Sequence, residues 1–139
     1  MAHLRLFTLQ QATSLLPRLM PLMRDLREAK QELDAIVASL GAIAHVTQGN
    51  GNVRDALSTQ DSPEDRLQEL QSRIQVGLDE IQALGCLVKD LDLGLVDFPS
   101  LREGEVVYLC WRLGEESIGY WHDLDSGFAG RRPLEQERL

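Results

Sequence analysis

The sequence predicts an α+β fold, in which a long antiparallel helical hairpin is followed by a small antiparallel β-meander. Over residues 12–40 and 67–84, apolar or small residues recur at alternating steps of three and four, which is the helical period. This period stops at Gly85. Beyond it, short runs of strand-forming residues alternate with Gly-containing turns, and most of the few aromatic residues lie within residues 98–128.

The first helix has a readable start at Thr8. Gln11 follows three residues later, so the two residues form a capping box that satisfies backbone donors at the helix start. Pro17 and Pro21 each remove a backbone donor and disfavour a helical residue before them. We therefore expect a short helix to about Leu16 and then a kink or a fresh start.

The long helix is predicted over residues 17–40, with Gly41 ending it. Residues 41–61 contain a Gly-Asn-Gly-Asn run and several other polar residues, so we expect a long mobile connection. The sequence lacks the lysine and the preceding strand of a phosphate-binding loop, which argues against that function for this run.

The second helix is predicted over residues 63–84. Ser62 can cap it, Pro63 takes the first helical position, and Gly85 ends it. Gly77 lies on the apolar seam at a cost of about 1 kcal/mol relative to alanine, which a close helix–helix approach would explain. The two seams can pair within one hairpin over residues 7–84 or with a second copy, and we predict a homodimer.

The β-rich module is predicted over residues 85–134, with a polar tail at 135–139, in a single domain covering 1–139. Its best strand is 105–112, which is rich in β-branched and aromatic residues. The other predicted strands and extended segments are residues 86–90, 95–98 and 118–122. Arg102-Glu103-Gly104 marks a hairpin turn.

Composition restricts the partners. The net charge is −8 and the sequence pI is about 4.8, which disfavours binding to nucleic acid or to anionic membranes. No signal peptide and no apolar run long enough for a membrane span is visible, and two cysteines do not make a disulfide framework. We therefore expect a cytoplasmic protein with reduced thiols.

The window from Asp90 to Asp125 holds nine carboxylates, with His122 and Cys110 among them. Histidine, cysteine and carboxylate side chains are ligands of divalent metals, so we hypothesise a metal site built on His122. The further candidate ligands are Asp123 or Asp125, one of Asp90, Asp97 or Glu115, and, for zinc, Cys86 or Cys110. The structural alternative is that His122 ends a strand and hydrogen-bonds a carboxylate, while both cysteines are small core residues.

Cys110 and His122 could instead be a nucleophile and its base, which requires a stabilised thiolate. The alternative, a buried structural thiol, is favoured. Whether the two side chains share a face depends on the register of the strand after the turn at residues 113–117, which the sequence leaves open.

Four side chains are candidates for ligand binding. The guanidinium groups of Arg112 and Arg131 suit an anionic ligand, and the alternative is an ion-pair network with Asp97 and Glu115. The indoles of Trp111 and Trp121 could form an aromatic platform, although core packing is the usual role of such residues on strands.

Four stretches of the chain together resemble a bacterial family known as domain of unknown function 2203. They are Phe7-Thr8 with Leu15-Leu16-Pro17; Gly85-Cys86 with Val88-Lys89-Asp90 and Gly94-Leu95-Val96-Asp97-Phe98-Pro99; Leu109-Cys110-Trp111-Arg112 with Gly114-Glu115; and Trp121-His122 with Gly127-Phe128-Ala129-Gly130-Arg131. The resemblance implies a bacterial cytosolic setting and the domain boundary. The family has no assigned activity, so the resemblance implies no reaction and no catalytic residues.

These observations predict a non-enzymatic interaction protein that acts as a homodimer, with divalent-metal binding as a further property. The alternative is a small metal-dependent or Cys/His enzyme with its site around His122. A bound metal would favour the second function, and an exposed helical seam or a stable partner complex would favour the first.

Overall fold

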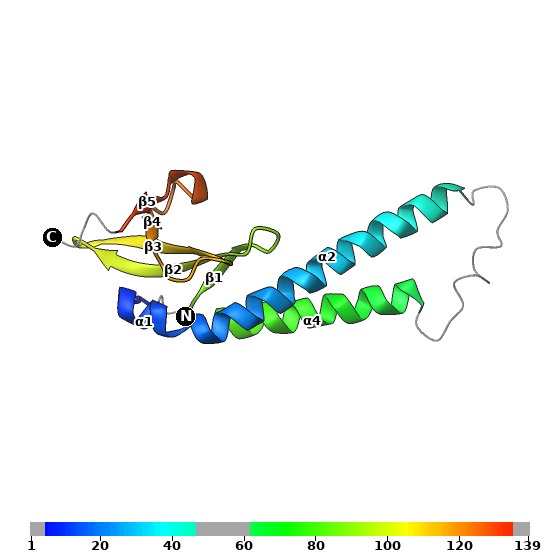
Figure 1. The fold of residues 1–139 in the computed structure, drawn as a ribbon, viewed down its shortest axis with the longest axis horizontal. Coiled ribbons are helices and arrows are strands. Elements are labelled where there is room, and N and C mark those ends of the chain that lie inside the picture. Colours follow the sequence, from blue (N-terminus) through cyan, green and yellow to red (C-terminus); the bar gives the residue numbers. More distant parts are fainter. Residues whose placement is uncertain (1–4, 47–61, 135–139) are drawn as a thin grey trace.

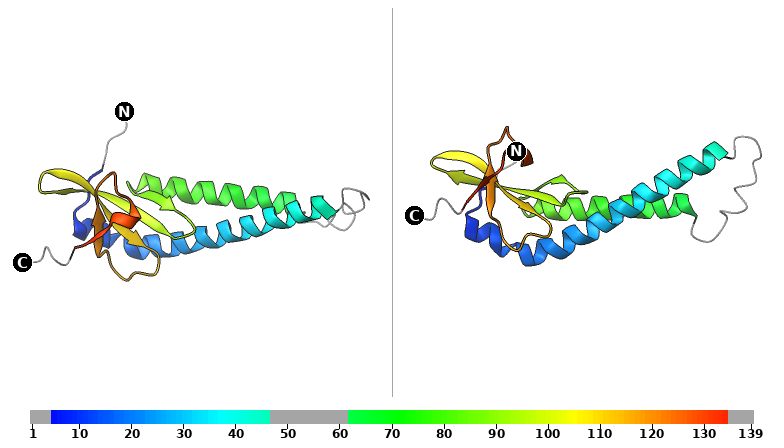
Figure 2. Two further views of the ribbon diagram at one scale, coloured as in Figure 1. Left: turned by 90° about the horizontal axis from the view of Figure 1, so that it is seen from above. Right: turned by 45° about the horizontal axis from the view of Figure 1, so that its top comes forward.

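The computed structural model of the chain describes residues 5–46 and 62–134 (Figure 1). Within them it contains helices and a five-stranded antiparallel sheet, so the predicted α+β class is confirmed. The sheet lies at one end of the molecule, and two long helices extend from it side by side toward the other end, with the chain running in opposite directions along them (Figures 1 and 2). From residue 47 onward the predicted connection lies outside the described residues, as does the predicted tail.

The first helix, α1 (Leu9–Ser14), begins as predicted. The Thr8 side chain accepts a hydrogen bond from the Gln11 N–H, and the Gln11 side chain accepts one from the Thr8 N–H, both at 3.0 Å. The capping box is therefore confirmed, and it fixes the direction in which the chain enters the helix.

The long helix α2 (Leu16–Val46) begins one residue before Pro17, so the predicted fresh start is confirmed. Pro17 lies in the first turn, where backbone N–H groups have no helical partner in any case. The helix continues past Gly41, so its predicted end at Leu40 is wrong. Gly41 keeps a φ outside the left-handed region, and its propensity cost of about 1 kcal/mol is tolerated within a helix of 31 residues.

Helix α4 (Pro63–Ala83) packs along α2 and has the predicted ends. The Ser62 side chain accepts a hydrogen bond from the Asp65 N–H at 3.1 Å, and Gly85 follows the helix with a φ of 98°. A Cβ atom placed on Gly77 would lie 2.5 Å from Cδ2 of Leu26 in α2. The close helix–helix approach inferred from this glycine is therefore present.

The strands follow one another in sequence order across the sheet. They are β1 (Leu87–Asp90), β2 (Leu95–Arg102), β3 (Glu105–Arg112), β4 (Tyr120–His122) and β5 (Arg132–Pro133). The predicted hairpin turn joins β2 to β3 through Glu103 and Gly104, whose φ angles of 51° and 81° are both left-handed. This conformation matches the twist of a two-residue hairpin.

Strands β1 and β4 begin one and two residues later than predicted, and the larger differences are at β2 and β5. Strand β2 continues through Pro99 instead of ending at Phe98. The Pro99 carbonyl accepts a hydrogen bond from the Phe7 N–H at 2.7 Å, so its backbone faces away from β3, on the side where β1 has already ended. The missing N–H of proline therefore costs no bond of the sheet. Strand β5 is absent from the predicted strands because two residues are too few to show a strand periodicity.

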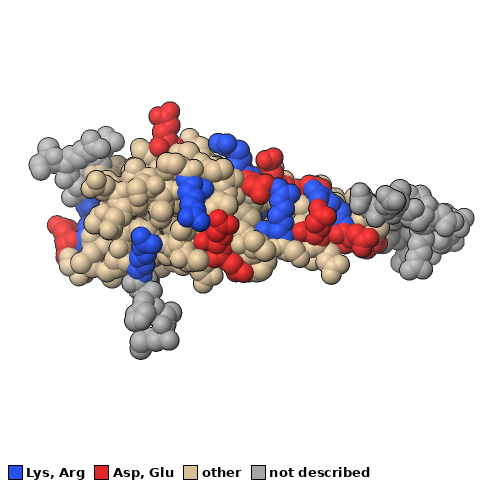
Figure 3. All heavy atoms as spheres, turned by 90° about the horizontal axis from the view of Figure 1, so that it is seen from below, with Lys and Arg blue, Asp and Glu red and all other residues tan. Residues whose placement is uncertain are grey.

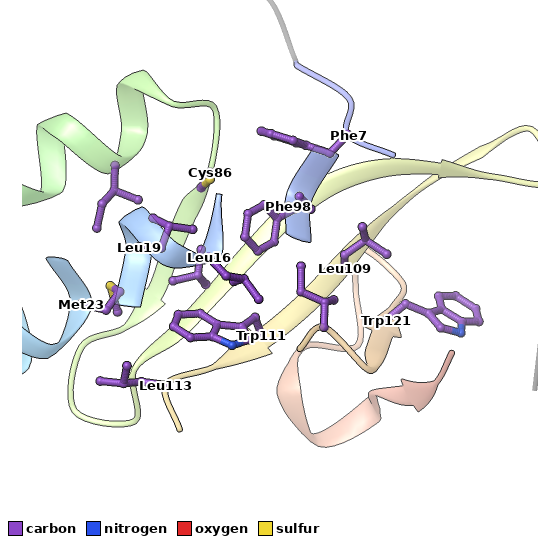
Figure 4. Close-up of a cluster of buried hydrophobic side chains, with 14 of the residues drawn as sticks. Phe7, Leu16, Leu19, Met23, Cys86, Phe98, Leu109, Trp111, Leu113 and Trp121 are labelled. Atoms are coloured by element: carbon purple, nitrogen blue, oxygen red, sulfur yellow. The ribbon is translucent and has the colours of Figure 1, made fainter. Parts of the chain in front are cut away.

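One face of the sheet packs on the helices and forms the hydrophobic core (Figure 4). Trp111 and Phe98 are fully buried there, and the ring of Phe7 meets Phe98 edge-on at 5.5 Å between centroids. Leu19 and Met23 of α2 complete this side with no exposed surface. The opposite face of the sheet carries Asp97, Cys110 and His122.

Acidic and basic side chains alternate along the helical part of the surface (Figure 3). Several of them pair across the two long helices, as Arg66 does with Glu32 at 2.6 Å and Arg73 with Asp25. Such exposed pairs contribute about 1 kcal/mol or less each. Within the described residues, no helix is long and apolar enough to cross a bilayer.

Candidate metal centre

The register of three strands gathers the candidate site on the sheet face opposite the helices. Asp97 of β2 lies directly opposite Cys110 of β3, and His122 of β4 lies opposite Tyr108, two residues before Cys110. Residues directly opposite in an antiparallel pair, and those two positions along, share one face. The side chains of Asp97, Cys110 and His122 therefore converge.

His122 is oriented through both of its ring nitrogens. Nδ1 lies 2.7 Å from the carbonyl oxygen of Asp123, and Nε2 lies 3.0 Å from Oδ2 of Asp97. A carbonyl oxygen only accepts, so Nδ1 carries a proton and donates it. Nε2 faces the Asp97 carboxyl group, and the side chains of His122 and Asp97 are 3% and 2% exposed.

The Cys110 thiol is buried beside this pair. Burial, and then the charge of Asp97, raises the pKa of the thiol to about 11, although a guanidinium nitrogen of Arg131 lies 3.9 Å from Sγ. Burial also raises the pKa of Asp97, against the opposing effects of His122 and Lys89. Without a bound cation, simultaneous ionisation of the Cys110 thiol and the Asp97 carboxyl group is therefore unfavourable.

The three side chains fit a transition metal. One ligand atom from each of Asp97, Cys110 and His122 can be chosen so that all lie within 4.8 Å of one another. Zinc binds such atoms at about 2.0–2.3 Å, which puts tetrahedral ligands about 3.3–3.8 Å apart, so the widest spacing here would have to close by about 1 Å when a metal binds. The Nδ1–H bond to the Asp123 carbonyl is the outer hydrogen bond that usually orients a metal-binding histidine.

A cavity of about 110 Å³ opens onto the three side chains. Its remaining lining consists of Lys89, Leu95, Tyr108, Leu124, Gly127 and Phe128. The ring of Tyr108 lies 5.4 Å from that of His122, and the Lys89 ammonium lies 4.8 Å from the Tyr108 ring centre. A small ligand in this cavity would lie beside Asp97, Cys110 and His122.

Arg131 holds the segment after β4 against the site. Its guanidinium lies 3.8 Å from the ring centre of Tyr120 and 4.6 Å from that of Phe128. It also donates to Glu115 at 2.6 Å. This contact set ties the 3₁₀ turn η1 (Phe128–Gly130), which carries the cavity residue Phe128, to the sheet.

The structure brings together some of the predicted ligands and separates others. Asp97, Cys110 and His122 meet, whereas the carboxylate of Asp123 lies 3.8 Å from Arg132 and Asp125 is exposed. Asp123 contributes its backbone carbonyl instead.

The other predicted ligands lie in different surroundings. Glu115 pairs with Arg131, and Asp90 accepts a hydrogen bond from the Leu93 N–H. Cys86 belongs to the hydrophobic core on the helix side.

The four predicted ligand-binding side chains do not form one site. Trp111 is fully buried in the core, and its indole N–H donates to the Glu115 carbonyl. Trp121 also belongs to the core and lies against Arg102 and Arg132.

The two arginines of that set lie beside Phe128. Arg112 is exposed, with its guanidinium 5.8 Å from the ring centre, and Arg131 is stacked between Phe128 and Tyr120 as described above. Of the predicted network, Glu115 joins Arg131 and accepts from the Arg112 N–H, while Asp97 pairs with His122.

Sequence reasoning missed the direct Asp97–Cys110 pairing and the cavity residues Lys89 and Tyr108. A two-residue turn at 103–104 fixes the register of the strands on either side of it. Continuing that register would have placed Asp97 opposite Cys110, had the strand not been ended before Pro99. No comparable local signal predicts the contact with Lys89.

The fold and the site define a small α+β protein with an Asp–Cys–His group on the sheet face opposite its long helices. The family model described as "Uncharacterized conserved protein (DUF2203)" matches residues 5–134. The chain belongs to this family, so the resemblance noted in the sequence is confirmed. Searches of curated proteins and of solved structures found no match.

Proposed function

We propose that the protein binds a divalent transition metal ion, zinc above all, through Asp97, Cys110 and His122. The observation that carries this proposal is the convergence of three different ligand types within 4.8 Å, with the histidine ring already oriented by a backbone carbonyl. A carboxylate, a thiolate and an imidazole are the ligand types that zinc accepts. Metal binding would also neutralise the charges that burial disfavours.

The geometry argues against a Cys/His nucleophile in the metal-free protein. Both ring nitrogens of His122 are directed at Asp97 and Asp123, so neither is available to remove the proton of Cys110. A thiol with a pKa near 11 is almost fully protonated at neutral pH. Among the enzymatic alternatives, a metal-dependent reaction is better supported than thiol catalysis.

Elemental analysis of untagged protein tests the proposal. We expect close to one zinc per chain after growth or dialysis with zinc, and loss of that metal in Asp97→Asn, Cys110→Ser and His122→Ala. Cys86→Ala is the matched control, since Cys86 is equally buried but lies in the core. Circular dichroism shows whether each variant folds. Folded variants that retain the metal, or a wild type that binds none, would refute the proposal.

The predicted homodimer remains a prediction that concerns the helices and not the metal centre. Its support is the half-exposed Val37 of α2 and the 65% exposed Val76 of α4, which are apolar side chains on the two long helices. Light scattering after gel filtration tests it, with Val76→Glu expected to shift a dimer toward the monomer. The interaction role, the absence of nucleic-acid binding and the cytoplasmic location also remain predictions.

A further inference from the structure

We infer that the proposed metal takes a small monoanion of the short-chain carboxylate class as its fourth ligand, held in the cavity beside Lys89. This inference depends on the proposed metal site. Three protein ligands leave one position of a tetrahedral zinc site open, which is the arrangement of reactive and not of purely structural sites.

The cavity restricts the ligand by size. All three proposed metal ligands belong to its lining, so an external ligand there has direct access to the metal. Its volume is about 110 Å³. A space of this size suits a small ligand such as acetate.

Charge favours a single negative charge on the ligand. The carboxylate of Asp97 and the thiolate of Cys110 would balance a dication, so a coordinated monoanion would leave the centre with one excess negative charge. Lys89 lies on the cavity lining, with its ammonium above the Tyr108 ring, and no carboxylate other than Asp97 belongs to that lining. The lysine therefore offsets the charge that the ligand adds.

Apolar surface favours a ligand with a short alkyl part. Leu95, Leu124 and Phe128 supply much of the remaining wall of the cavity. An alkyl group gains from contact with these side chains, whereas a strongly hydrated dianion such as sulfate would lose its water without polar partners to replace it. A short carboxylate can coordinate the metal, offset its charge against the Lys89 ammonium and place its alkyl part against the apolar wall.

Cobalt-loaded full-length protein provides the test, because the visible spectrum of Co²⁺ reports its coordination. Sodium acetate is titrated at constant ionic strength, with sodium sulfate titrated separately for comparison. We expect acetate to change the cobalt spectrum with saturation and sulfate to leave it unchanged. The intensity of the cobalt bands before any addition shows independently whether the metal is bound.

Lys89→Met tests the predicted role of the lysine, since it removes the charge and keeps an apolar stem. We expect acetate affinity to fall about fivefold while the cobalt content stays the same. Arg18→Met is the control for a general loss of positive charge, because Arg18 lies on α2 and pairs with Glu80. It should leave acetate affinity unchanged.

The outcomes separate the inference from the function on which it depends. Bound cobalt with a spectrum that acetate does not change would overturn the anion site and leave the metal site standing. Equal losses in Lys89→Met and Arg18→Met would overturn the contribution of Lys89. A protein that binds no cobalt or zinc would overturn the metal site and, with it, the anion site.

Discussion

Nε2 of His122 lies 3.0 Å from Oδ2 of Asp97, and both side chains are almost fully buried on the sheet face opposite the long helices. The pair joins β4 to β2 across the intervening β3, which supplies Cys110. A buried polar pair of this kind specifies how the strands align, because a slip in register would leave both groups without partners.

Zinc should stabilise the folded protein through this group. A ligand that binds the folded state alone adds about 2.7 kcal/mol at one hundred times its Kd. We expect a gain of this order in the free energy of unfolding, measured by urea titration with and without zinc. Asp97→Asn, Cys110→Ser and His122→Ala should each abolish the gain. A gain that persists in folded variants of all three residues would place the zinc elsewhere.

Two glycines in the long helices should respond oppositely to alanine. Gly77→Ala forces a Cβ to within 2.5 Å of the Leu26 side chain, so we expect a net loss of about 1 kcal/mol despite better helix propensity. Gly41→Ala meets no atom within 4 Å and should add about 0.5–1 kcal/mol. Urea unfolding measures both. A stabilising Gly77→Ala would show that the two helices lie further apart than described.

Arg131 and Arg132 are neighbours with different expected contributions. Arg131→Lys loses the stacking on Tyr120 and Phe128 and weakens the pair with Glu115, in which the side chains are 16% and 25% exposed. We expect it to cost about 1–2 kcal/mol. Arg132 is 62% exposed, so Arg132→Lys should change stability by less than about 0.5 kcal/mol. Thermal unfolding of both variants checks the difference, and equal shifts would contradict it.

The buried Cys86 thiol should make stability depend on pH in the alkaline range. Burial raises its pKa from 9.0 to about 11, with a smaller opposing effect of Arg5. The folded state therefore holds this proton more tightly, and the associated stability is present below about pH 9 and lost as the pH rises through about 11. Between these values we expect the free energy of unfolding to fall more steeply in wild type than in Cys86→Ala. Identical slopes in urea titrations would count against the prediction.

The sequence by itself determined the features that depend on neighbouring residues. The capping box of Thr8 and Gln11 and the cap at Ser62 are contacts between residues three apart, so local pattern specifies them. The hairpin turn ending at Gly104 is specified in the same way. The predicted helix end at Gly41 was wrong because a glycine permits a helix to end but does not require it to do so.

Only the tertiary structure decided the site. The sequence supplied His122, Cys110 and Asp97 as candidates, together with other carboxylates that it could not tell apart. Side chains on a strand alternate between two faces, so a one-residue change in the pairing of β3 with β4 would have turned His122 away from Cys110. That pairing follows a long connection with no fixed turn geometry, and the packing of the whole sheet on the helices selects it.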